Sequence, residues 1–300
     1  MNVGPEHDAP RPRVGDDFSD AVTVAFADTR AELFGVTRLG LADRGASGLA
    51  IVFHRGEPVA VRAEAGVPAE APEAWDAIAA AGLETETLEP LRAWRLRLRA
   101  EDAELDLELR TDGAVAVLDP DHPVARAGGM TGFEQAVRVT GGASVHGRHI
   151  AVDGLGQRGH SWGAPDWDEI AVARTVSAWL GDDLGVTLSA IRPAGARHHE
   201  AERIAAAVFD REPASGVARA TGVAEPRLST TYDGAGHQRS AGLELFMDGD
   251  ALPRRAAGEL VCGTTVDLGR LRLQCAFFRW RMEGRTGVGR YDVLARAVAT

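Results

Sequence analysis

Apolar and polar residues alternate along much of this chain, in short segments separated by turn-forming residues. A period of two residues predicts β-strands that bury one face and expose the other. Turn signals such as Asp112-Gly113 and Asp153-Gly154 stand between the segments. Outside the hairpin described next, the expected strands are residues 21–27, 31–41, 48–54, 58–65, 114–118, 133–139, 149–153, 170–179, 184–191, 203–209, 228–232, 242–247, 259–265 and 271–282.

The clearest pattern predicts a β-hairpin over residues 94–109. Apolar residues alternate with arginines in its first half and with acidic residues in its second half, and a tight turn is expected at Glu101-Asp102. The expected cross-strand pairs are Arg99–Glu104, Arg97–Asp106, Arg95–Glu108, Leu98–Leu105 and Leu96–Leu107. A shift of one residue would bury every arginine, so the pattern specifies the register.

Little of the chain favours helix. One helix is expected over residues 72–81, where Pro72 stands at the start and Gly82 follows the end; residues 203–208 fit either a helix or a strand. Many short strands with so little helix predict an all-β fold of antiparallel barrels or sandwiches.

Amino-acid composition and the positions of glycine pairs suggest how the chain divides into domains. Residues 1–15 are polar and rich in proline, which predicts a disordered leader. Gly-Gly pairs between residues 128 and 156 suggest a boundary between two β-domains. We expect an N-terminal domain over residues 16–140 and a C-terminal domain over residues 141–300.

The 300 residues are 45% hydrophobic, enough for a sizeable core. A net charge of −11 argues against nucleic acid and anionic membrane surfaces as partners. The two cysteines do not suggest a disulfide framework, and there is neither a signal peptide nor an apolar run long enough to span a bilayer. A cytoplasmic protein is expected, and the abundance of Ala, Arg and Gly is typical of GC-rich bacterial genes.

Candidate chemistry is concentrated in the segment from Gly154 to Trp167. In an extended strand Arg158, His160 and Trp162 would share one face. Asp166 follows an expected bend at residues 163–165 that could return its carboxylate to the imidazole. Each residue also has an ordinary structural interpretation: a hydrogen-bonded histidine, a turn aspartate and core tryptophans.

Cofactor-binding signatures are weak elsewhere. His146 and His149 have a metal-like spacing but no clustered third ligand. Gly154 and Gly156 do not form a nucleotide fingerprint, and there is no Gly-x-Ser-x-Gly elbow. These patterns predict neither a metal site nor a nucleotide site.

The residues Phe133-Glu134-Gln135, the segment 152–163 with its His-Ser-Trp-Gly core, Asp166-Trp167 and the closing segment 275–292 carry a resemblance. They resemble the hydroxyneurosporene synthase (carotenoid 1,2-hydratase)-like superfamily, which includes AttH-type proteins. The resemblance implies two lipocalin-like β-barrel domains that enclose a lipophilic ligand. Gly159 stands where the motif usually has Asp, and Pro165 where an Arg is common. These differences leave the substrate and the reaction open.

The resemblance also implies cofactor-free acid chemistry on a terpenoid or polyketide-like substrate. Protonation of an alkene or epoxide would lead to hydration or cyclisation. The catalytic candidates are His160 and Asp166, and replacing either by alanine should abolish turnover. The candidates for substrate binding are Trp162, Trp167, Arg158, Glu134, Tyr232 and Tyr291, with Asp292 as a further acid. Two alternatives remain open: a pericyclase that mainly folds its substrate, and a lipocalin-like binder without catalysis.

Overall fold

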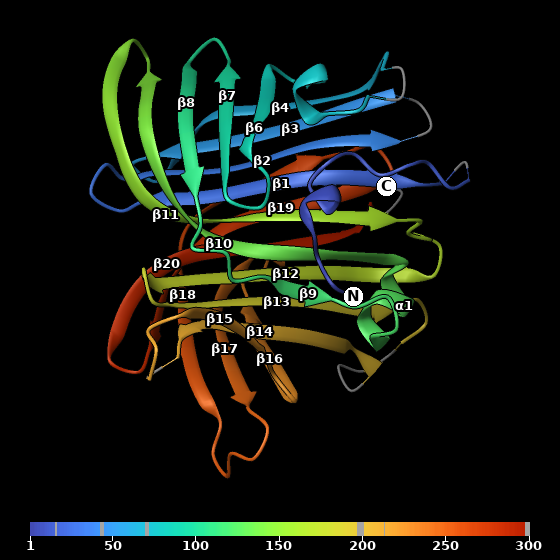
Figure 1. Ribbon diagram of the computed structural model, residues 1–300, viewed down its shortest axis with the longest axis vertical. Helices are drawn as coiled ribbons and strands as arrows, with labels where there is room; N and C mark the ends of the chain where they lie inside the picture. The colour runs from blue at the N-terminus through green and yellow to red at the C-terminus, as the bar shows by residue number, and fades with distance from the viewer. Residues whose placement is uncertain (16, 43–44, 70–71, 197–200, 213, 298–300) are drawn as a thin grey trace. The chain divides into compact units, whose positions relative to one another are not determined.

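The structure is a computed structural model that describes residues 1–297 except 16, 43–44, 70–71, 197–200 and 213. It is almost entirely antiparallel β-structure (Figure 1), which confirms the all-β fold class. The described residues form two compact units, one of residues 1–120 and 130–165 and the other of residues 121–129 and 166–297.

The first unit contains one sheet with the strand order β4-β3-β2-β1-β11-β10-β8-β7-β6-β5, and β9 pairs with β10 beside this path. Its strands are β1 (Ser19–Asp28), β2 (Leu33–Ala42), β3 (Gly45–His54), β4 (Glu57–Val67), β5 (Ala79–Ala80), β6 (Leu83–Glu89), β7 (Ala93–Arg99), β8 (Ala103–Arg110), β9 (Ala116–Leu118), β10 (Met130–Val145) and β11 (Arg148–Gly163). Two short 3₁₀ helices, η1 (Pro5–His7) and η2 (Trp75–Ala77), accompany them.

The second unit contains a sheet with the strand order β15-β14-β13-β12-β20-β19-β18-β17-β16. Its elements are α1 (Pro123–Gly128), β12 (Ile170–Gly181), β13 (Leu184–Pro193), β14 (Arg203–Arg211), β15 (Ala218–Gly222), β16 (Glu225–Tyr232), β17 (Gln238–Phe246), β18 (Arg254–Asp267), β19 (Leu271–Met282) and β20 (Arg285–Arg296). Each unit has its own apolar interior. In the described chain, no helix is both long and apolar enough to span a bilayer.

The structure divides the chain at a different place from the expected boundary at residues 140/141. That position lies inside β10, which pairs with β11 along its whole length. His146 and Gly147, with φ of 48° and 76°, form the left-handed turn between the two strands. At Gly141 a Cβ would lie only 2.3 Å from the backbone oxygen of Asp106. These glycines therefore permit close strand contact, and β11 with its motif belongs to the first unit.

A glycine also brings the two ends of the first sheet together. A Cβ on Gly48 of β3 would lie 2.3 Å from the backbone oxygen of Ala80 in β5. Nearby, the backbone N–H of Ala81 donates to Glu64 Oε2 of β4 at 2.6 Å. The sheet therefore curls until its two edges meet, and only a residue without a side chain fits at the contact.

Replacing Gly48 by alanine is expected to destabilise the first unit by about 1–3 kcal/mol, because the added methyl group overlaps backbone atoms. The measurement is the free energy of unfolding in urea. Gly222→Ala is the control, since nothing lies within 4 Å of a Cβ at that strand position. An equal and small effect of both substitutions would contradict this close approach.

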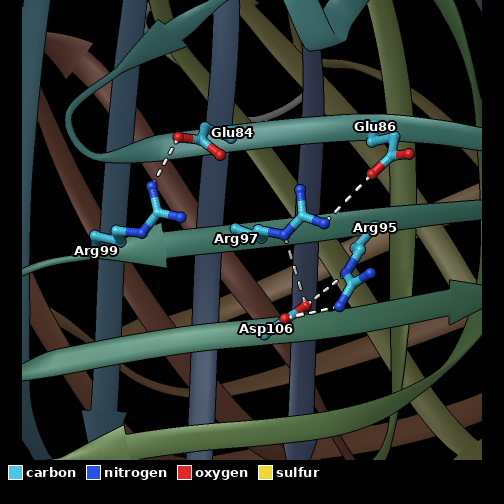
Figure 2. Close-up of polar contacts among 6 residues, drawn as sticks. All are labelled: Glu84, Glu86, Arg95, Arg97, Arg99 and Asp106. Atoms are coloured by element: carbon cyan, nitrogen blue, oxygen red, sulfur yellow. Dashed lines mark hydrogen bonds and ion pairs between the residues drawn. The ribbon is translucent and has the colours of Figure 1, made fainter.

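The hairpin of β7 and β8 has the predicted register in all five cross-strand pairs. Of the expected ion pairs, Arg97–Asp106 is present at 3.9 Å, and the other contacts in Figure 2 differ from the expected ones. Arg95 bonds diagonally to Asp106 at 2.7 Å, while Arg97 and Arg99 bond to Glu86 and Glu84 of β6 at 3.5 and 3.0 Å. Burial of the leucines determines the register, whereas the long, exposed arginine side chains can reach several carboxylates.

The helix expected over residues 72–81 is wrong. This segment forms η2 and then β5. Trp75 and Ile78 are each 2% exposed, so burial of their side chains fixes the backbone here. Ala81 and Gly82 then have φ of 55° and 77° and form the turn into β6. Tertiary burial therefore overrides the local helix preference.

Candidate functional site

Arg158, His160 and Trp162 project from one face of β11, as the alternation predicts. β11 lies between β1 and β10, where Val22 and Phe133 flank His160. Val22 and Phe133 are buried apolar residues, 4% and 2% exposed. The motif therefore faces the interior of the first unit.

Both ring nitrogens of His160 are occupied. Nδ1 lies 2.7 Å from the backbone oxygen of His7, and Nε2 lies 2.7 Å from Asp20 Oδ1. A carbonyl oxygen only accepts hydrogen bonds, so Nδ1 carries a proton. Nε2 and the Asp20 carboxyl group must share a second proton, since two bare acceptors would repel each other. The pair thus holds a proton where His160 is 0% exposed.

Asp20 also accepts a backbone hydrogen bond and lies near a positive charge. The backbone N–H of Arg11 donates to Asp20 Oδ2 at 2.6 Å. Burial lowers the pKa of the nearby Arg38 guanidinium, and the negative charge of Asp20 opposes that shift. Donors and positive charge stabilise a carboxylate. The second proton of the pair therefore lies between Nε2 and Asp20 Oδ1.

Aromatic rings surround this imidazole. The ring centroids of Trp162, Trp75 and Phe133 lie 5.1, 5.4 and 5.7 Å from that of His160. Trp162 is half-buried, and the Arg11 guanidinium lies 5.1 Å from the centroid of its ring. Faces of such rings stabilise positive charge.

Arg158 forms a buried ion pair with Asp8, and each residue is 2% exposed. Asp8 Oδ2 also accepts from Trp94 Nε1 and from the backbone N–H of Leu91, both at 2.8 Å. The guanidinium lies 4.4 Å from the Trp94 ring centroid. Burial lowers the pKa of Arg158, and Asp8 counteracts part of that shift.

The N-terminal residues therefore differ from the disordered leader expected from composition. Besides the Asp8 contacts, the indole of Trp75 donates to the backbone oxygen of Asp8 at 3.0 Å. We call residues 5–11 the N-terminal strap. The local composition of the strap predicts disorder, but the buried Asp8 carboxylate has three partners in the first unit and the Asp8 backbone oxygen has a fourth. Such long-range pairing does not appear in local sequence.

Glu134 lies on the other face of the sheet, opposite Gly159. Its Oε2 accepts from Gln157 Nε2 at 2.9 Å, and a Cβ on Gly159 would lie 2.4 Å from the same carboxylate. Arg158, on the opposite face of the sheet, pairs with Asp8. Glu134 instead fills the space above Gly159.

Asp166 is exposed and belongs to the second unit. Its Oδ1 accepts from the backbone N–H of Asp168 at 2.8 Å, which makes it a turn residue. The expected return of this carboxylate to the imidazole is not found, because Asp20 and His7 occupy both nitrogens of His160. Trp167, half-buried, lies in the same turn.

Tyr291 lies in the apolar interior of the second unit at 0% exposure, whereas Tyr232 is 43% exposed at the end of β16. The Tyr291 hydroxyl lies 2.6 Å from Thr230 Oγ1 and accepts from Arg174 at 3.2 Å. Arg174 also pairs with Glu202. The two tyrosines therefore lie in different environments. Tyr291 is a hydrogen-bonded core residue, and Tyr232 is a surface residue.

Burial raises the pKa of Tyr291 to about 12. An unfolded tyrosine ionises near pH 10, so this residue stabilises the fold fully below that pH and less as the pH rises towards 12. We expect Tyr291→Phe to cost about 1–3 kcal/mol at neutral pH. Urea unfolding at pH 8 and pH 11.5 measures both effects. The difference between wild type and variant should shrink at the higher pH; a constant difference would contradict the raised pKa.

The sequence reasoning missed Asp20, Asp8 and Trp75. Asp20 is the second residue of β1, a mostly apolar strand, and pairs directly with Trp162 across β1 and β11. An acidic residue at an inward strand position is a usable signal, but only once the strand pairing is known. Over the described ranges, no group of three His, Cys, Asp or Glu side chains is arranged to hold a metal ion.

Comparison with solved structures identifies the fold class of this chain. Solved structures with the same lipocalin-like fold include AttH (NE1406) from Nitrosomonas europaea, at 14% identity and a TM-score of 0.66, covering 93% of this chain and 92% of that one. CghA with Sch210972 matches at 11% identity and 0.66, covering 93% and 88%. Kievitone hydratase from Nectria haematococca matches at 10% and 0.61, covering 93% and 89%.

The chain belongs to the family described as a domain of unknown function (DUF7064), whose model matches residues 4–296. No curated protein sequence is similar enough to be matched to this chain. The structural similarities support the resemblance to the AttH-like, hydratase and cyclase fold, and at these identities they establish the fold alone.

Proposed function

We propose that this protein acts on a lipophilic small molecule without a cofactor, as a cyclase or hydratase. The fold is shared with kievitone hydratase and with CghA, which has been solved with Sch210972. The observation that carries the proposal is the His160–Asp20 pair, a proton held in a dry site. Alkene or epoxide protonation needs an acid of this kind.

The proposed acid is His160 rather than Asp166. His160 is buried among aromatic rings, whereas Asp166 is exposed to water. His160 would transfer its Nδ1 proton to the substrate, leaving a carbocation facing Trp162 and Phe133. Water or an internal double bond would then add to the cation, and the imidazole would take back the proton that is released. Asp20 keeps the imidazole oriented throughout.

This step requires the N-terminal strap to move. The His7 backbone oxygen accepts the Nδ1 hydrogen bond, so a substrate must displace His7 to receive that proton. The hydrogen bond between His7 and His160 also favours a second candidate function, that of a binder without catalysis. In that function Arg158 and His160 serve to hold the strap. The pericyclase alternative needs no proton transfer at all.

One experiment separates these functions. The purified protein is incubated in D₂O with polyenes, whose protonation forms a carbon–deuterium bond, and products are analysed by mass spectrometry. Acid-initiated hydration or cyclisation places one deuterium on a carbon of the product, whereas a pericyclic product gains none. Bound but unconverted substrates would indicate the binder. Products without carbon-bound deuterium would overturn the role given to His160.

A further inference from the structure

Strand β4 is an open edge of the sheet in the first unit. Among the described strands it pairs with β3 alone, so one side of its backbone has no strand partner. Where the ends of the sheet meet, β5 lies over the face of β3 at Gly48. The neighbouring Ala81 N–H contacts the Glu64 side chain of β4. These contacts leave the outer backbone of β4 uncovered, and residues 61–66 are all exposed.

The turn between β3 and β4 shows which backbone groups point outward. Arg55 and Gly56 form a two-residue turn, with φ of 53° and 86°. The pair that closes such a turn is hydrogen-bonded, and hydrogen-bonded pairs alternate with open pairs along the hairpin. Counted through the bulge at Val59, residues 60, 62 and 64 bond to β3. The N–H and C=O groups of residues 61, 63 and 65 therefore point away from the sheet.

The middle of β4 carries none of the prolines, lysines or bulges that usually protect a sheet edge. Pro58 stands beside the turn, and the shifts in register lie near the two ends of the strand. Between them, residues 60–65 pair regularly with residues 47–52 of β3. The outward-pointing residues are apolar, and Val61 is 44% exposed. Such an edge is a template for another strand.

The sequence of β4 is complementary to itself when two copies run antiparallel. With Ala63 opposite its own counterpart, Arg62 lies opposite Glu64 of the partner subunit on one face, and symmetry repeats this pair. On the other face, Val61 lies opposite Ala65 of the partner subunit. Charged side chains usually discourage pairing at an edge, but here each one meets the opposite charge. In the same register, the outward backbone groups of the two strands face each other.

We propose that this edge binds a second copy of the chain, so that two first-unit sheets continue into each other through β4. The two-fold axis at Ala63 makes the contact isologous, and the assembly therefore closes at two copies. A single pair of strands is a small interface, below the about 1,200 Å² at which stable complexes begin, so a micromolar dissociation constant is expected. The dimer does not depend on proton transfer by His160.

The test is sedimentation equilibrium of the full chain at micromolar concentrations, where we expect a reversible equilibrium between monomer and dimer. Arg62→Glu places like charges opposite each other in both pairs and should raise the dissociation constant about tenfold or more. Arg239→Glu is the matched control and should leave the constant unchanged. It makes the same charge change at an exposed position of β17, which has strand neighbours on both sides.

Two further variants test the register, and the urea midpoint verifies that each is folded. Arg62→Glu combined with Glu64→Arg reverses both charges and should restore the dissociation constant to within about threefold of the wild type. Ala63→Pro removes an outward N–H that the sheet does not use and should abolish the dimer.

A chain that stays monomeric would overturn the proposal, as would a dimer that neither Arg62→Glu nor Ala63→Pro weakens. His160→Gln should dimerise like the wild type. Failure of the dimer and failure of the proposed catalysis therefore give different results.

Discussion

Replacing Asp8 by alanine is expected to destabilise the first unit by about 3–5 kcal/mol. The substitution leaves the Arg158 guanidinium buried and without its counterion, and it also removes the acceptor for Trp94 Nε1 and the Leu91 N–H. Urea unfolding measures the loss. Trypsin should also cleave after Arg13 in the folded variant, because the strap loses its anchor.

Two comparisons make this expectation specific. Asp106→Ala removes an exposed ion pair with Arg95 and should cost less than about 1 kcal/mol. The double variant Asp8→Ala, Arg158→Met should recover much of the loss, since no buried charge remains unpaired. Equal costs for Asp8→Ala and Asp106→Ala would show that the strap contributes little to the fold.

His160→Gln is expected to lower turnover of a lipophilic substrate by about 10²- to 10⁴-fold, the usual contribution of a general acid. Glutamine can still donate to Asp20, so the barrel should remain folded, which circular dichroism and the urea midpoint will verify. The readout is deuterium incorporation from D₂O.

Asp166→Asn is the control for this variant. The residue is exposed in a turn, and its Oδ1 contact with the Asp168 N–H is retained by the amide oxygen. Turnover should be unchanged. A large loss in Asp166→Asn together with an active His160→Gln would transfer the acid role to Asp166.

The sequence predicts the fold where burial alone decides the outcome. The leucines of the β7–β8 hairpin specify its register, and alternation places Arg158, His160 and Trp162 on one face. The first result requires only that one face of each strand be apolar. The second requires only that side chains alternate between the two faces of a strand.

Contacts between distant segments were not predictable in this way. Composition indicates a disordered leader, yet Asp8 pairs with Arg158, 150 positions further along the chain. Likewise the partner of His160 is Asp20, at a separation of 140 residues, and not the nearby Asp166. Local sequence patterns identify which polar side chains need partners, whereas the topology of the sheet determines which residue becomes the partner.

The protonation of His160 is tested most directly by ¹⁵N NMR of its side chain at neutral pH, assigned with His160→Gln. The hydrogen bonds to the His7 carbonyl and the Asp20 carboxylate predict that Nδ1 and Nε2 both carry protons. A neutral ring with a bare Nε2 would contradict this, and with it the proposal that the pair stores the proton used in catalysis.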